Sequence, residues 1–77
     1  MSNKAEAFLA AIGGAENVTH VEGCITRIRL EVKDTSLVGD VPLREAGAFG
    51  VVVQNQVVQI IVGPEVDALV EDINALL

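Results

Sequence analysis

The chain has 77 residues, of which 51% are hydrophobic and 3% aromatic, and its formal net charge is −6 at pH 7. This length fits one domain over 1–77, without a second lobe to enclose a substrate. The negative charge and the lack of Tyr and Trp argue against nucleic-acid binding, and no apolar run approaches the roughly 18 residues of a membrane span. One Cys and one His are too few for an internal disulfide or a four-ligand metal site. We therefore expect a cytoplasmic domain that binds, carries or relays, and that needs no cofactor.

Hydrophobic periodicity predicts three helices and four strands. In chain order they are a helix over 3–12 that ends at Gly13-Gly14, two strands within 18–32, a short helix near 40–47, strands over 49–54 and 57–62 that flank Asn55-Gln56, and a helix that starts at Gly63-Pro64. The strands come in hairpin pairs, which favours a four-stranded antiparallel sheet with the helices packed on one face. The sequence thus predicts an α+β fold with the order α-β-β-α-β-β-α.

The only cysteine of the chain, Cys24, lies in the first predicted hairpin, close to two of the five basic residues. If Cys24 and Ile25 form the turn, Glu22 faces Arg27 across the two strands. This register puts Val21 and Ile28 together on the core side and every charged residue on the opposite face. We therefore predict that Cys24 is exposed at the tip of the hairpin, beside the guanidinium groups, and that Glu22 pairs with Arg27.

Cys24, Arg27 and Arg29 form a candidate site for a phosphoryl group. A cysteine attacks as its thiolate, and neighbouring cations favour that form. The two arginines are separated by two strand positions, about 6.5–7 Å, so one anion with several oxygens reaches both. Their planar guanidinium groups match the oxygens of a phosphoryl group and stabilise its charge during transfer. The residue types indicate a cysteine that accepts a phosphoryl group and holds it briefly.

Other interpretations of these residues are still open at this point. A lone cysteine is most often a small core residue, and a row of charged side chains is often only a solvated strand face. Glu22 opposes thiolate formation beside it, and His20 is expected to be a surface residue. A redox role lacks a resolving cysteine, and a cysteine phosphatase needs a longer loop between Cys and Arg. A regulatory or protein-interaction domain with an inert cysteine is the main alternative to a carrier.

A longer stretch of the sequence resembles a known family. Asn17-Val18, followed by Cys24-Ile25-Thr26-Arg27-Ile28-Arg29 and a downstream Asp34, resembles the phosphorylation-site signature of the enzyme IIB domain of bacterial sugar phosphotransferase systems, glucose type. Similar stretches at Gly13-Gly14, 47–52 and 58–63 extend the resemblance over nearly the whole chain. The family fold is a four-stranded antiparallel sheet with helices on one face, in agreement with the prediction from periodicity.

The resemblance implies that Cys24 becomes a phosphocysteine. It takes the phosphoryl group from a phosphohistidine of enzyme IIA and passes it to a sugar, N-acetylglucosamine or glucose, held by the membrane-embedded enzyme IIC. The implied catalytic residues are Cys24, Arg27 and Arg29, and the implied phosphate-binding or supporting residues are Glu22, Ile25, Thr26 and Gln59. Family members often have Asp two residues before the cysteine, so Glu22 is a longer substitute.

Docking to such partners requires apolar residues beside the charged centre. The candidates are Val18, Ile25, Val57 and Ile61, because alternation places the strand members on the face away from the core. We expect a monomer that reaches the inner face of the cell membrane through enzyme IIC and does not insert into it. The sequence leaves open whether the chain is a free subunit or part of a larger permease.

Overall fold

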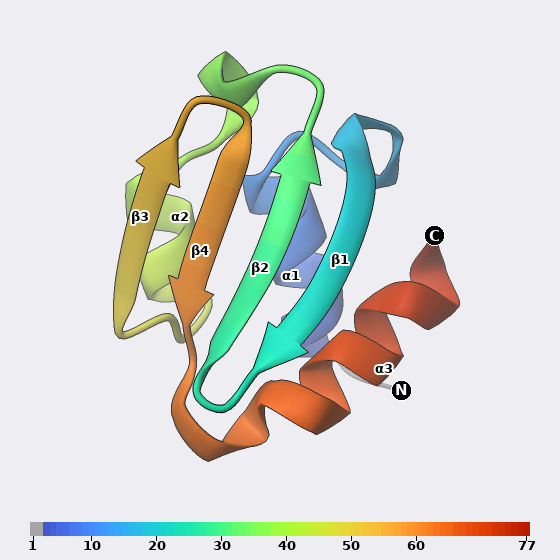
Figure 1. Cartoon of the computed structure of the whole chain (residues 1–77), viewed down its shortest axis with the longest axis vertical. Coiled ribbons are helices and arrows are strands. Elements are labelled where there is room, and N and C mark those ends of the chain that lie inside the picture. Colours follow the sequence, from blue (N-terminus) through green and yellow to red (C-terminus); the bar gives the residue numbers. More distant parts are fainter. Residues whose placement is uncertain (1–2) are drawn as a thin grey trace.

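A computed structural model describes residues 3–77 and contains every predicted element (Figure 1). The helices and strands are α1 (Asn3–Ala11), β1 (Val18–Cys24), β2 (Arg27–Val32), α2 (Asp40–Glu45), β3 (Gly50–Gln54), β4 (Val57–Ile61) and α3 (Val66–Leu76), and the short 3-10 helices are η1 (Ala15–Asn17), η2 (Thr35–Leu37) and η3 (Gly63–Glu65). The strands form one antiparallel sheet in the order β1-β2-β4-β3. The predicted α+β fold and its order of elements are confirmed.

The helices cover one face of the sheet and leave the other face open (Figure 1). Alternate residues of the two central strands point into the layer between sheet and helices, where they are at most 2% exposed; they are Ile28, Leu30 and Val32 of β2 and Val58 and Ile60 of β4. Phe8 of α1 and Ile73 of α3 are fully buried against them. Burial of each such large apolar side chain stabilises the folded state by about 1.5–3 kcal/mol. Within residues 3–77, no helix combines the length and apolarity of a membrane span.

The first hairpin turns one residue later than predicted. Cys24 is the last residue of β1 and pairs with Arg27, so Ile25 and Thr26 form the turn. The predicted register, in which Glu22 faces Arg27, is therefore wrong, because Glu22 faces Arg29. Each residue from 20 to 23 meets a partner two positions further along than predicted. A shift by two positions keeps these four side chains on their predicted faces.

The backbone of Thr26 explains the position of this turn. Its carbonyl oxygen accepts hydrogen bonds from the N–H groups of Val62, at 2.9 Å, and Gly63, at 3.1 Å. These bonds hold Thr26 at the end of β4, where it closes the hairpin instead of extending β2. The two donors are more than thirty positions away in the sequence, so the alternation within 18–32 carries no information about them.

A bulge near the start of β1 reverses the orientation of Val18. Val18 pairs with Val32 and His20 pairs with Glu31, so β1 has one residue more than β2 between these pairs. Val18 consequently packs against the core instead of projecting from the open face. Its predicted place on a docking surface is wrong.

Asn17, which is 4% exposed, joins the open end of the first hairpin to the end of α1. Its Nδ2 donates to the carbonyl oxygens of Ile12, at 2.7 Å, and Asp34, at 3.0 Å, and its Oδ1 accepts from the N–H of Asp34 at 2.9 Å. The Asp34 carboxylate in turn accepts from the hydroxyl and the backbone N–H of Ser36, which holds the pKa of Asp34 below its usual range. The Asn and the Asp of the sequence signature therefore fix the hairpin base.

Candidate functional site

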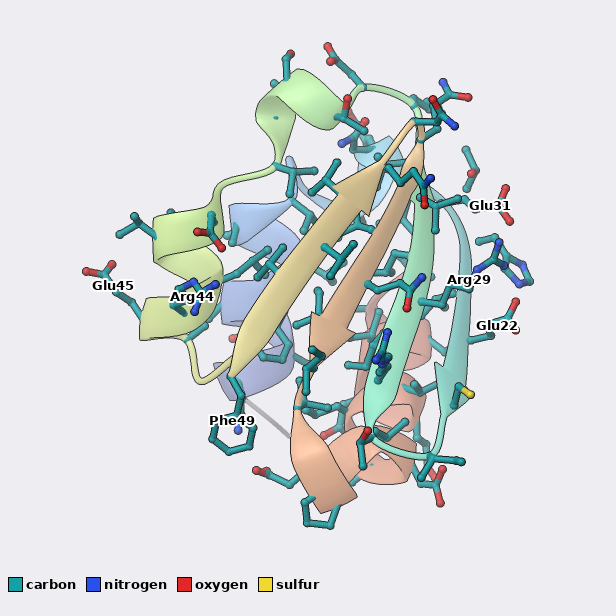
Figure 2. The ribbon with its side chains drawn as sticks, turned by 60° about the vertical axis from the view of Figure 1, so that its left-hand side comes forward. Glu22, Arg29, Glu31, Arg44, Glu45 and Phe49 are labelled. Carbon is teal, nitrogen blue, oxygen red and sulfur yellow. The ribbon has the colours of Figure 1, made fainter. Side chains whose placement is uncertain are left out.

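The open face of the sheet presents three rows of side chains, because residues paired across antiparallel strands share a face. The cysteine row is Cys24–Arg27–Ile61–Gly50, the middle row is Glu22–Arg29–Gln59–Val52, and the far row is His20–Glu31–Val57–Gln54. Figure 2 shows Glu22, Arg29 and Glu31 projecting from this face, away from α2. The structure thus brings five of the predicted site residues onto one face and places Ile25 and Thr26 in the adjoining turn.

Cys24 is a free, exposed cysteine at the end of the edge strand β1. The preceding residue, Gly23, faces the helices, and a Cβ at that position would lie 2.7 Å from Cγ1 of Val66 and 3.1 Å from Cγ2 of Val70. Because glycine has no side chain, the first turns of α3 pack directly behind the backbone that bears Cys24. The sulfur is therefore presented to solvent from a supported strand end.

Arg27 lies opposite Cys24 in the register, but its guanidinium group is bound over a different strand. Its Nη1 donates to Oε1 of Gln59 at 2.9 Å. Gln59 belongs to β4, and β2 separates β4 from the strand that carries Cys24. The tip of Arg27 is thus held on the side of β2 away from β1.

Arg29 is held by carboxylates. Its Nη1 lies 3.4 Å from Oε1 of Glu22 and 3.8 Å from Oε2 of Glu31. The predicted pairing of Glu22 with Arg27 is therefore wrong, and the corrected register, which puts Glu22 opposite Arg29, is the reason. All four side chains of this group, His20 included, are about half exposed.

The same oxygen of Glu22 has a second and closer partner. Nε2 of His20 lies 2.9 Å from it, and this hydrogen bond, followed by the charge of Arg29, holds the pKa of Glu22 below its usual value. We expected His20 only as a surface residue. The contact with Glu22 could have been predicted from their spacing of two within a strand, because residues at i and i+2 share a face.

Two exposed apolar side chains lie near the cysteine row. Ile25 is 89% exposed in the turn, and Phe49 is 70% exposed at the start of β3, where its N–H donates to the carbonyl of Ile61 at 2.8 Å (Figure 2). Ile61 itself is on the open face, as predicted. Phe49 was not predicted as a site residue. In the sequence it is only the first residue of the strand predicted over 49–54, and nothing there marks it as exposed.

The open face therefore combines one thiol with two guanidinium groups and lies beside an apolar rim. Such a surface suits reversible contact with an anion that arrives on another protein, since the groups are reached without entering a cavity. Among residues 3–77, no three His, Cys, Asp or Glu side chains gather in a way that would hold a metal ion.

Comparisons with known proteins relate the chain to a family. Residues 6–38 match a family model described as phosphotransferase system, EIIB. The chain is 40% identical over 77 residues to the N-acetylglucosamine-specific EIIB component of Streptomyces coelicolor, with 100% of both chains covered. It is 47% identical over 69 residues to the N-acetylglucosamine-specific EIICB component of Bacillus subtilis, which covers 88% of this chain and 15% of that relative.

The fold has a solved counterpart as well. The crystal structure of one domain of the IIabc component of the phosphotransferase system from Clostridium difficile superposes with a TM-score of 0.79, at 26% sequence identity, over 94% of this chain and 76% of that chain. The stretch matched by the family model includes Cys24, and the likeness to the Streptomyces relative covers the full length of both chains. The chain belongs to the EIIB family of the phosphotransferase system.

Proposed function

We propose that this domain carries a phosphoryl group on Cys24, between a phosphohistidine of enzyme IIA and a sugar bound by enzyme IIC. Membership of the EIIB family implies a part in phosphoryl transfer during sugar uptake. The observation that supports Cys24 as the carrier is its exposure on the open face, directly opposite Arg27 and one row from Arg29.

The proposed chemistry has two steps. In the first, the sulfur of Cys24 attacks phosphorus, an S–P bond forms, and the N–P bond of the donor histidine breaks, with the thiol proton balancing the imidazole that is released. In the second, a sugar hydroxyl oxygen attacks phosphorus, an O–P bond forms and the S–P bond breaks. The hydroxyl proton is balanced by the thiol that re-forms, so the domain returns to its starting state.

The role of Arg27 and Arg29 is to bind the phosphoryl oxygens and stabilise the charge that spreads over them during each transfer. A guanidinium group offers forked donors that match two oxygens at once. Ile25 and Thr26 follow the sulfur in the turn, and backbone N–H groups of turns are further donors for anions. This division of roles needs no cofactor.

The apolar rim is the proposed contact for both partners. It consists of Ile61, within the cysteine row, and of Ile25 and Phe49, which adjoin its end members Cys24 and Gly50 in the chain; a partner that covers them removes water from the transfer site. The two relatives described above are N-acetylglucosamine-specific by name, so we propose this sugar. Contact with enzyme IIC places the domain at the inner face of the membrane.

Phosphorylation by purified components tests the proposal. The chain is incubated with phosphoenolpyruvate, the general phosphotransferase proteins and an N-acetylglucosamine-type enzyme IIA, and its mass is measured intact and after fragmentation. We expect one added phosphoryl group on the wild type and none on Cys24→Ser. The matched control is His20→Gln, which removes the only histidine and should still accept the group.

Two results would contradict the proposal in different ways. A phosphoryl group that persists in Cys24→Ser and disappears in His20→Gln would move the acceptor to His20. A wild-type chain that stays unmodified with an active enzyme IIA would favour the alternative function, a protein-interaction domain with an inert cysteine.

A further inference from the structure

The two arginines of the open face are held by different kinds of acceptor. Arg27 is bound by a neutral amide oxygen, that of Gln59, at 2.9 Å. Arg29 has a long contact of 3.4 Å to an oxygen of Glu22 that His20 approaches more closely, at 2.9 Å. A phosphoryl dianion binds guanidinium groups more strongly than an amide or a shared carboxylate oxygen does. The present partners are therefore of a kind that such an anion displaces.

We propose that Gln59 and Glu22 are positioning residues that hold Arg27 and Arg29 while Cys24 is unmodified, and that both arginines exchange these partners for the phosphoryl oxygens once Cys24 carries the group. This inference rests on the proposed function, because it concerns the same site. It assigns the two residues a role in the unmodified protein, in place of direct contact with the phosphoryl group.

The layout of the rows supports the exchange. Gln59 lies one row from the cysteine row and on the strand beyond β2, so a side chain held there is turned away from the sulfur. Glu22 lies on the same strand and face as Cys24, two positions away, so its negative charge repels a phosphoryl group at the sulfur. Release of Arg29 from Glu22 toward the new group offsets that repulsion. Both arginines have to travel only over an exposed surface, with no packing to break.

The direction in which a substitution shifts the phosphorylation equilibrium distinguishes this positioning role from direct binding of the phosphoryl group. A residue that holds Arg27 only in the unmodified protein stabilises that state, so its removal favours the phosphorylated state. A residue that binds the phosphoryl group has the opposite effect. Removal of one hydrogen bond of this kind shifts the equilibrium about three- to tenfold.

The experiment measures phosphoryl exchange at equilibrium with the phosphorylated N-acetylglucosamine-type enzyme IIA. The phosphorylated fraction of the chain is determined by intact mass for the wild type, Gln59→Leu, Glu22→Gln and Gln54→Leu. Gln54 is the matched control, because it lies on the same face but in the far row of β3. We expect the equilibrium to shift toward the phosphorylated chain by about three- to tenfold in Gln59→Leu and in Glu22→Gln, and to stay unchanged in Gln54→Leu.

Side-chain nitrogen spectra of the arginines give a second readout that a general loss of stability would not produce. The Arg27 signal of unmodified Gln59→Leu should differ from that of the unmodified wild type, whereas the two phosphorylated proteins should give the same Arg27 signal. A lower phosphorylated fraction in Gln59→Leu, or Arg27 signals that still differ after phosphorylation, would overturn the partner exchange while leaving Cys24 as the carrier. A wild type that accepts no phosphoryl group would overturn both proposals.

Discussion

The two hairpins of the sheet have the same construction and different turn residues. The first joins its strands through Ile25-Thr26 and the second through Asn55-Gln56. In both turns the first residue has a positive φ, 49° for Ile25 and 55° for Asn55. Asparagine tolerates this conformation, whereas a β-branched residue there is a true outlier that costs about 1–2 kcal/mol.

In the first hairpin, no burial of the turn side chain compensates for this cost. The side chain of Ile25 is 89% exposed, so it buries almost no apolar surface that would offset its strained backbone. The second turn, at the opposite end of the sheet, has a residue that suits its conformation (Figure 1). We propose from this difference that the turn beside Cys24 serves contact with a partner, whereas the residue at Asn55 suits folding.

The largest expected effect is on the rate of phosphoryl transfer, which we assign to residues of the first hairpin. Arg27→Lys should slow phosphoryl transfer to the sugar by about a hundredfold, because a lysine ammonium cannot make the forked contacts of a guanidinium. The rate is measured with radiolabelled N-acetylglucosamine and membranes that contain enzyme IIC. Arg44→Lys is the control, since Arg44 lies on α2 in an ion pair with Asp40. Equal rates for the two variants would remove the assigned role of Arg27.

The base of the first hairpin should be the most sensitive point for stability. Asn17→Ala removes the partner of the N–H of Asp34 and of the carbonyl of Ile12, which should lower the free energy of unfolding by about 2–3 kcal/mol. Urea unfolding measures the loss. Asn74→Ala, at an exposed position of α3, is the control and should change stability little. If the two variants unfold alike, the hairpin base does not depend on the Asn17 side chain.

Exchange of the turn residues tests the contrast between the hairpins directly. Ile25→Asn should raise the free energy of unfolding by about 1 kcal/mol, and Asn55→Ile should lower it by a similar amount, because only asparagine tolerates the positive φ. Ile25→Asn should also weaken binding to enzyme IIA, which titration calorimetry measures. A stabilised Ile25→Asn variant that binds enzyme IIA normally would contradict the assignment of this turn to partner contact.

The smallest effect concerns pH. The pKa of Glu22 in the folded chain is below its ordinary value of 4.5, so the carboxylate contributes stability that is fully present above pH 4.5 and is lost as the pH falls through the lowered pKa. Glu22→Gln removes this contribution, so the free energy of unfolding should fall less steeply on acidification than in the wild type. Chemical unfolding at neutral pH and below pH 4.5 measures the difference. Glu45→Gln, which removes a carboxylate on α2, is the matched control.

Much of the fold was predictable from the sequence because its determinants are local. The alternation from Arg27 to Val32 assigns each side chain to a face, and the positions of Gly47 and Gly63 mark element ends. The register was not predictable, because the hydrogen bonds that stop β2 at Thr26 come from Val62 and Gly63. The inward turn of Val18 depends on a bulge that alternation does not reveal.

The composition of the site was predictable, but the contacts within it were not. Period-two spacing puts Arg27 and Arg29 on one face, and their motif indicates phosphoryl chemistry. Which acceptor each arginine binds depends on the neighbouring strands. Gln59 reaches Arg27 only because β4 lies beside β2, and Glu22 reaches Arg29 only because of the later turn.

The carbonyl oxygen of Thr26 also provides a natural reporter of motion near the sulfur. Because it accepts from two amides, separation of the turn from the end of β4 exposes the N–H groups of Val62 and Gly63 together. The rates at which these two N–H groups exchange hydrogen with solvent therefore report how often the turn separates from the end of β4. The measurement works for the modified and the unmodified chain and needs no label on the cysteine.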